Sequence, residues 1–151
     1  MPIKESYEKA LRKAIENAPY YQLLQIRLEE IDAGYARFRM PFRRELVQGY
    51  GVAHGGAITS LADTAVAFAL MTLIQPGERV TTVEMKINFL AAVTEGELIG
   101  ESRILQKGKQ LALADMEVKD GKGKLVAKGL ATYMILSLGQ KEELRVKSPQ
   151  G

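Results

Sequence analysis

The first forty residues carry two different patterns of apolar positions. Between residues 6 and 18 apolar side chains recur at intervals of three and four, which predicts a short amphipathic helix, and Pro19 is expected to stop it. Two strand-like segments follow on either side of a turn at Asp32–Gly34. In the second of these segments Ala36, Phe38 and Met40 share one face, and polar and aromatic residues share the other.

Residues 55 to 74 are different because they are apolar on nearly every side of a helical projection. Such a helix must be buried, and about five turns is short for a membrane span. The sequence Gln75-Pro76-Gly77 is expected to terminate it.

The remainder of the chain predicts about four antiparallel strands. Val83, Met85, Ile87 and Phe89 alternate with Thr82, Glu84, Lys86 and Asn88, and further strands are expected over residues 97–106, 110–119 and 125–136. Tight turns are predicted at 107–109 and 120–123, and a loose tail at 139–151. The order of elements predicts an α+β fold in a single domain over residues 1–151. In it a curved antiparallel sheet wraps one long buried helix, preceded by a short helix at about 4–18.

Composition removes several classes of function. The chain has no cysteine and one histidine, which excludes disulfides, thiolate chemistry and a multi-histidine zinc site within one chain, so we expect no metal. The net charge is +3, with no dense Lys/Arg block, and nucleic-acid binding is not expected. Neither a secretory signal nor a membrane span is recognisable, so we expect a cytoplasmic location.

Asp63 is the first candidate for chemistry because it lies inside the apolar helix. An unpartnered buried carboxylate costs several kcal/mol, and aspartate is a poor helix former away from the N-terminus. The structural alternative is that the Asp63 carboxylate accepts local hydrogen bonds or faces a hydrated dimer interface. We favour a functional carboxylate.

His54-Gly55-Gly56 stands at the entrance of the same helix. Paired glycines permit close approach to the backbone, and the free N–H groups of a helix N-terminus suit a developing oxyanion. The alternative is an ordinary turn with His54 as the helix cap. Asp63 shares a helical face with Gly56 but lies roughly 10 Å away along the axis. We therefore expect a homodimer whose sites combine the two halves from different chains.

Residues 51–65, Gly-Val-Ala-His-Gly-Gly-Ala-Ile-Thr-Ser-Leu-Ala-Asp-Thr-Ala, resemble the signature of hotdog-fold thioesterases, and most closely the phenylacetic-acid-degradation (PaaI-like) type. The strand at 82–90 and Gln106–Lys109 also agree with that family, and the similarity extends over about residues 22 to 136. The resemblance implies a hotdog fold, hydrolysis of an acyl-coenzyme A thioester, no cofactor, and a homodimer that pairs further into a tetramer.

The resemblance also implies roles for individual residues. Asp63 would be the nucleophile or the general base, the Gly55 N–H would polarise the thioester carbonyl, and His54 would orient the thioester or the leaving sulfur. Gln48 stands where many PaaI-like members have Asn and other hotdog thioesterases have Gln, which leaves the acyl preference open. Thr82 falls near a family Ser/Thr that helps to hold the attacking water.

Residues for coenzyme A and for the acyl group are indicated less specifically. The candidates for coenzyme A are Gly56, Lys86, Asn88, Arg103, Lys107, Gly108 and Lys109, and a solvated hairpin and strand face is an equally good interpretation of the charged ones. The candidates for lining an acyl pocket are Tyr20, Tyr21, Tyr50 and Phe68. The alternative is that these four are ordinary core or interface residues. A non-catalytic acyl-CoA-binding module and a hotdog hydratase or dehydratase are the rival functions. The characteristic motifs of the last group do not occur here.

Overall fold

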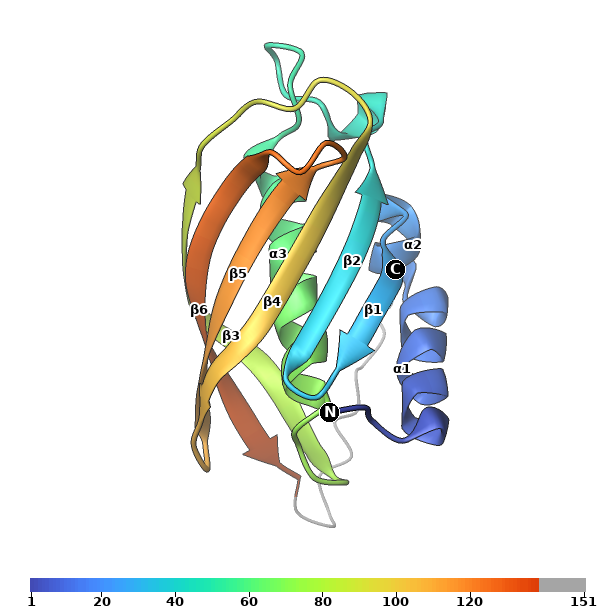
Figure 1. Cartoon of the computed structure of the whole chain (residues 1–151), viewed down its shortest axis with the longest axis vertical. Coiled ribbons are helices and arrows are strands. Elements are labelled where there is room, and N and C mark those ends of the chain that lie inside the picture. The colour runs from blue at the N-terminus through green and yellow to red at the C-terminus, as the bar shows by residue number, and fades with distance from the viewer. Residues whose placement is uncertain (139–151) are drawn as a thin grey trace, which may run out of the picture.

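The computed structural model describes residues 1–138, and it shows a curved antiparallel sheet wrapped around one central helix (Figure 1). The predicted tail at 139–151 lies outside the described residues. The elements are α1 (Glu5–Asn17), α2 (Pro19–Leu24), β1 (Arg27–Asp32), β2 (Tyr35–Pro41), a 3-10 turn (Arg44–Leu46), α3 (Gly55–Met71), β3 (Glu78–Phe89), β4 (Glu97–Lys107), β5 (Leu111–Asp120) and β6 (Leu125–Ser137). This is the α+β arrangement that the sequence predicted.

The six strands follow the order β1-β2-β4-β5-β6-β3, so β1 and β3 are the edges of the sheet. Helices α1 and α2 lie beside β1 (Figure 1), and Arg12 of α1 donates a 3.0 Å hydrogen bond to the Leu28 carbonyl. In contrast, β3 pairs only with β6 among the described strands. An uncovered edge strand leaves backbone N–H and C=O groups ready to pair with another chain.

Helix α3 is buried because the concave face of the sheet supplies apolar side chains along its length. Ala36, Phe38 and Met40 of β2 are fully buried, as their alternation predicted. On β4, Gly100 lets the helix approach closely: a Cβ at this position would lie 2.7 Å from Cγ of Leu61. No helix in residues 1–138 is both long enough and apolar enough to cross a membrane.

Helix α1 ends at Asn17, before Pro19, as the sequence predicted, but the short helix that follows was not expected. Pro19 begins a second short helix, α2, because proline at the first helical position loses only an N–H that has no helical partner. Helix α3 ends at Met71 and not near Ile74, because the Thr72 hydroxyl donates a 2.6 Å hydrogen bond to the Ala69 carbonyl and accepts the Gly34 N–H.

The predicted alternation of β3 also needs correction. The register against β6 shifts between Thr82 and Glu84, which is the signature of a β-bulge at Val83. Val83 is half exposed, at 52% of its surface. Because of the extra residue, Thr82 and Glu84 project from opposite faces of the sheet. Thr82 points toward α3, and Glu84 points outward. The edge of the sheet thereby gains a hydroxyl on its inner face.

Candidate active site

Asp63 is half-buried on the third turn of α3 and is held by two hydroxyl groups. Thr82 of β3 donates a 2.9 Å hydrogen bond to its Oδ1. Tyr133 of β6 donates to the same oxygen and lies 2.9 Å from the Asp63 backbone carbonyl. Both donors use Oδ1, and no residue in 1–138 donates a hydrogen bond to the second oxygen, Oδ2. Asp63 therefore has one anchored oxygen and one available for chemistry.

The two donors reach Asp63 together because they are directly opposite each other on neighbouring strands. Opposed residues of antiparallel strands project to the same face of the sheet. Tyr133 was not among the residues singled out from sequence. The signal was its position between the inward-facing Ala131 and Ile135, since a buried tyrosine hydroxyl normally requires a hydrogen-bond partner.

A cavity of about 360 Å³ opens beside Asp63. Tyr20 and Tyr21 of α2 form part of its wall, and the Tyr20 hydroxyl lies 2.5 Å from Oγ of Ser60. Burial raises the pKa of both Tyr21 and Tyr133 above the ordinary phenol range, and the Asp63 carboxylate raises them further. Both phenols are therefore protonated at neutral pH and able to donate. The other lining residues are Ser60, Thr64, Ala67, Met71, Val80, Thr81, Thr82 and Tyr133.

Of the remaining acyl-pocket candidates, neither lines this cavity. Phe68 is buried in the core, edge-to-face against Phe38 at 5.3 Å between ring centroids. Tyr50 is 94% exposed.

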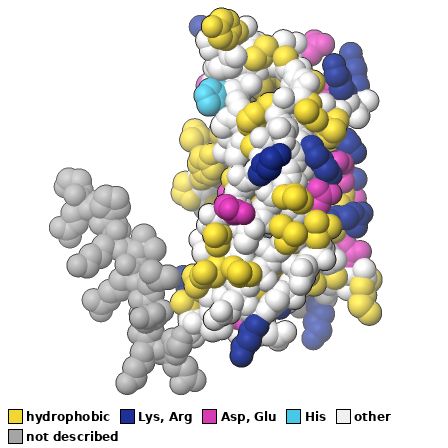
Figure 2. All heavy atoms as spheres, turned by 90° about the vertical axis from the view of Figure 1, so that its left-hand side faces the viewer, with side chains coloured by type: hydrophobic (Ala, Val, Ile, Leu, Met, Phe, Trp, Pro, Cys, Tyr) yellow, Lys and Arg dark blue, Asp and Glu magenta, His cyan; other side chains and the backbone are white. Residues whose placement is uncertain are grey.

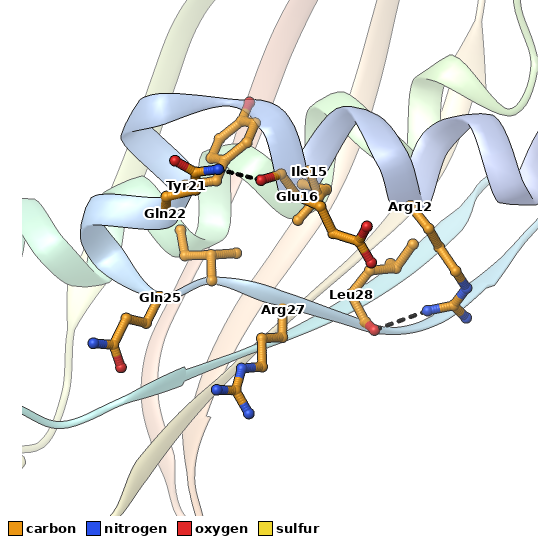
Figure 3. Close-up of a pocket in the computed structure, with 9 residues that line it drawn as sticks. Arg12, Ile15, Glu16, Tyr21, Gln22, Gln25, Arg27 and Leu28 are labelled. Carbon is orange, nitrogen blue, oxygen red and sulfur yellow. Dashed lines mark hydrogen bonds between the residues drawn. The ribbon is translucent and has the colours of Figure 1, made fainter.

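A second cavity, of about 460 Å³, lies between α1, α2 and β1 (Figure 3). Tyr21 lines both cavities. Its hydroxyl points away from Gln25 and Arg27 of the second cavity (Figure 3). The ring of Tyr21 is thus a shared wall between a cavity that contains the candidate carboxylate and one that does not.

The N-terminus of α3 forms the other half of the candidate site. Nδ1 of His54 accepts the Gly56 N–H at 2.7 Å, and the N–H groups of Ala57 and Ile58 bond to the His54 carbonyl. Within residues 1–138 the Gly55 N–H has no acceptor. It therefore remains available, at the positive end of the helix dipole, while the Gly56 N–H is already used by the cap.

The ring of Phe89, at the end of β3, covers Gly55. A Cβ added to Gly55 would lie 3.1 Å from this ring, so glycine is what allows the close packing. Because Nδ1 of His54 is an acceptor, the neutral imidazole carries its proton on Nε2, which can donate to a ligand. His54 itself is exposed. Nδ1 thus provides the predicted cap, and Nε2 remains available for the predicted ligand-facing role.

Gln48 lies in the loop that leads to His54. This loop is closed by hydrogen bonds from the Gln48 N–H to the Val52 carbonyl, at 2.9 Å, and from the His54 N–H to the Leu46 carbonyl, at 2.7 Å. Oε1 of Gln48 accepts the Tyr50 N–H, which leaves its NH₂ group as the free end. The structure therefore brings Gln48 to the His54–Gly55 end of the helix.

Asp63 and Gly55 do not meet within one chain. They are eight residues apart on α3, which corresponds to a rise of roughly 12 Å. The described residues thus form two half-sites, one around Asp63 and one around Gly55, as the helix spacing predicted.

The candidates for coenzyme A binding do not gather at one place in the chain. Lys86 of β3 donates to Oδ1 of Asn88 at 2.8 Å. Arg103 of β4 stacks 4.4 Å above the Tyr35 ring, and β4 is separated from β3 by β5 and β6. Lys107 is the last residue of β4, and Gly108 and Lys109 lie in the turn before β5, where the Gly108 N–H bonds to the Leu111 carbonyl. These contacts give several of them structural roles and leave their ligand-binding roles as predictions.

Comparison with known proteins shows the family of the chain. The family model described as "Thioesterase superfamily" matches residues 50–127, which include Gly55 and Asp63. The chain belongs to the thioesterase superfamily. A presumed esterase of Saccharolobus solfataricus is 32% identical over 125 residues, which cover 83% of each chain. The acyl-coenzyme A thioesterase PaaI of Escherichia coli is 30% identical over 113 residues, or 74% of this chain and 79% of that one.

A solved structure supports the same assignment. The conserved protein PA5202 of Pseudomonas aeruginosa superposes with a TM-score of 0.77 at 32% identity, over 82% of this chain and 98% of that one. The hotdog fold and thioester hydrolysis as the class of activity follow from this membership. This superfamily member is therefore an enzyme.

Proposed function

We propose that the protein hydrolyses acyl-coenzyme A thioesters to a free acid and coenzyme A, with Asp63 as the reacting carboxylate. The observation that carries this proposal is the arrangement at Asp63, where two hydroxyls occupy Oδ1 and leave Oδ2 beside a cavity of about 360 Å³. As a nucleophile, Oδ2 would attack the carbonyl carbon and expel the thiolate, and water would hydrolyse the resulting anhydride. As a general base, Oδ2 would take a proton from the attacking water.

The Gly55 N–H is proposed to polarise the thioester carbonyl. It is the free donor of the first turn of α3, and a preorganised backbone donor at a helix N-terminus stabilises a developing oxyanion. The NH₂ of Gln48 and Nε2 of His54 lie at the same end and would orient the thioester. The Thr82 hydroxyl donates to Asp63, and its oxygen can still accept a hydrogen bond from the water. This chemistry uses side chains, backbone and water and requires no cofactor.

The two half-sites would meet across a homodimer formed by the β3 edges. On β3, Thr82 lies beside Asp63, and Phe89 lies beside Gly55. If β3 pairs antiparallel with β3 of a second copy about a two-fold axis near Met85 and Lys86, Thr82 of each copy faces Phe89 of the other. Asp63 of one copy then approaches Gly55 of the other.

The surface of this edge supports the pairing. Three large apolar residues are more than half exposed: Val83 and Phe89 of β3, and Leu90 directly after the strand. Figure 2 shows the corresponding side of the molecule, with hydrophobic side chains gathered near the histidine and Lys and Arg side chains between further hydrophobic groups. A paired β3 edge would cover apolar surface that is otherwise exposed to water. Pairing of two such dimers into a tetramer is part of the same proposal.

The acyl group would enter the cavity beside Asp63, where Tyr20, Tyr21 and Met71 supply aromatic and apolar walls. An aromatic or medium-length acyl group suits such walls. A panel of acyl-CoA thioesters in a thiol-detecting assay tests both activity and preference. Asp63→Asn should retain acyl-CoA binding and lose turnover by orders of magnitude. A protein that binds acyl-CoA without releasing thiol would be a binding module instead.

Mixing two inactive variants tests the shared site. Asp63→Asn damages one half-site, and Gly55→Pro removes the N–H of the other. Mixed dimers would contain one intact site each, so refolding the two variants together should restore about a quarter of wild-type turnover. No recovery beyond the separate variants would exclude sites shared between chains.

A further inference from the structure

We propose that Tyr133 is a positioning residue that fixes the plane of the Asp63 carboxylate for catalysis. This inference rests on the proposed role of Asp63. Tyr133 is 2% exposed, and its side chain stands on the inner face of β6 between the sheet and α3. Its hydroxyl reaches both the backbone carbonyl and Oδ1 of Asp63.

The single phenol proton goes to the carboxylate. An ionised carboxylate oxygen is a stronger acceptor than a backbone carbonyl, so Oδ1 takes the proton in preference to the carbonyl oxygen. The phenol keeps this proton at neutral pH because burial and the adjacent carboxylate both raise the pKa of Tyr133. Tyr133 therefore acts as a permanent donor, and it cannot compete with Asp63 as a base.

Two donors on one oxygen constrain the carboxylate more than one donor does. Thr82 and Tyr133 approach Oδ1 from adjacent strands, so rotating the carboxylate plane away from this orientation stretches both bonds. Oδ2 is consequently held in one direction. Holding a reacting atom in its attack geometry contributes to turnover without adding contacts to the substrate.

The structural supports of the two donors differ. Thr82 lies on an edge strand beside a bulge, and it is exposed in the single chain. Tyr133 lies on β6, which is paired on both sides, opposite Thr82 and Ala112. The more rigidly held donor is thus Tyr133, and we expect it to set the carboxylate orientation.

Tyr133→Phe removes the hydroxyl and keeps the ring in the core. Tyr7→Phe is the matched control, because the Tyr7 hydroxyl donates a 2.6 Å hydrogen bond to the Met71 carbonyl of the same helix, away from Asp63. We expect Tyr133→Phe to lower kcat for an acyl-CoA substrate by about tenfold to a hundredfold, the range for a hydrogen bond to a charged group, with KM unchanged. Tyr7→Phe should leave both constants at wild-type values.

The variant Thr82→Val and the double variant complete the test. If both hydroxyls hold the same oxygen, the change in kcat of the double variant will differ from the product of the two single changes. If the two hydroxyls act independently, the double variant will show that product. Melting temperatures and circular dichroism of each variant give the folded fraction by which kcat is corrected. A corrected kcat for Tyr133→Phe equal to that of Tyr7→Phe, or multiplicative effects in the cycle, would overturn the positioning role. Thiol release by the wild type and its loss in Asp63→Asn are measured in parallel, so that failure of the proposed function is recognised separately.

Discussion

The hydroxyl of Thr82 donates a 2.9 Å hydrogen bond to Oδ1 of Asp63, joining the edge strand of the sheet to the central helix. This contact exists because a bulge at Val83 turns Thr82 inward. It places a group from the expected dimer edge directly on the candidate catalytic carboxylate. Activity and assembly are therefore expected to depend on the same short segment of β3.

Thr82→Val should lower kcat by about tenfold to a hundredfold, because it removes a hydrogen bond to an ionised group while preserving a β-branched shape. Thr132→Val is the control: Thr132 precedes Tyr133 on β6 and faces the opposite side of the sheet, opposite Glu84. Steady-state kinetics of both variants decide the point. Equal activity of the two would contradict a role for the Thr82 hydroxyl.

Replacing Gly55 tests the backbone donor directly. Gly55→Ala adds a Cβ against the Phe89 ring and keeps the N–H, whereas Gly55→Pro adds similar bulk and removes the N–H. The helix accepts proline here because Gly55 is the first residue of α3 and His54 is extended. Loss of an oxyanion donor should make Gly55→Pro about a hundredfold to a thousandfold slower in kcat than Gly55→Ala. Similar rates for the pair would show that steric packing alone matters at Gly55.

Two substitutions of His54 separate capping from chemistry. Nδ1 of His54 caps α3 by accepting the Gly56 N–H. His54→Ala should reduce the free energy of unfolding by about 1 kcal/mol through loss of the cap, and His54→Asn should retain it. Both should lose activity, because neither presents a donor at the position of Nε2. Denaturant unfolding and kcat are the two measurements, and full activity in His54→Asn would restrict His54 to the cap.

Tyr21 is expected to limit the length of the acyl group. Its ring separates the cavity beside Asp63 from the second cavity at the N-terminal helices (Figure 3). Tyr21→Ala should join the two and raise kcat/KM for long acyl chains relative to short ones. Leu23→Ala, on the exposed side of the same short helix, is the control. An unchanged profile across an acyl-CoA chain-length series would show that the second cavity is not reached.

Sequence patterns were sufficient for the elements whose signals are local. The all-round apolar character of residues 55–71 determined that α3 is buried, and the alternation of residues 35–40 determined which face of β2 meets it. Helical geometry alone indicated that Asp63 and Gly56 are too far apart to contact one small reacting group. The His-Gly-Gly entrance and Asp63 were therefore predicted from the sequence as two candidate half-sites.

The tertiary structure determines which groups lie next to Asp63. Simple alternation placed Thr82 with the outward-facing Glu84, and only the register of β3 against β6 shows the bulge that turns it inward. Tyr133 is far from Asp63 in sequence, and its partnership depends on how β6 packs behind α3. Bulges and contacts between distant segments arise from pairing and packing between segments. For that reason the candidate carboxylate could be predicted from the chain, and the hydrogen bonds from Thr82 and Tyr133 that hold it could not.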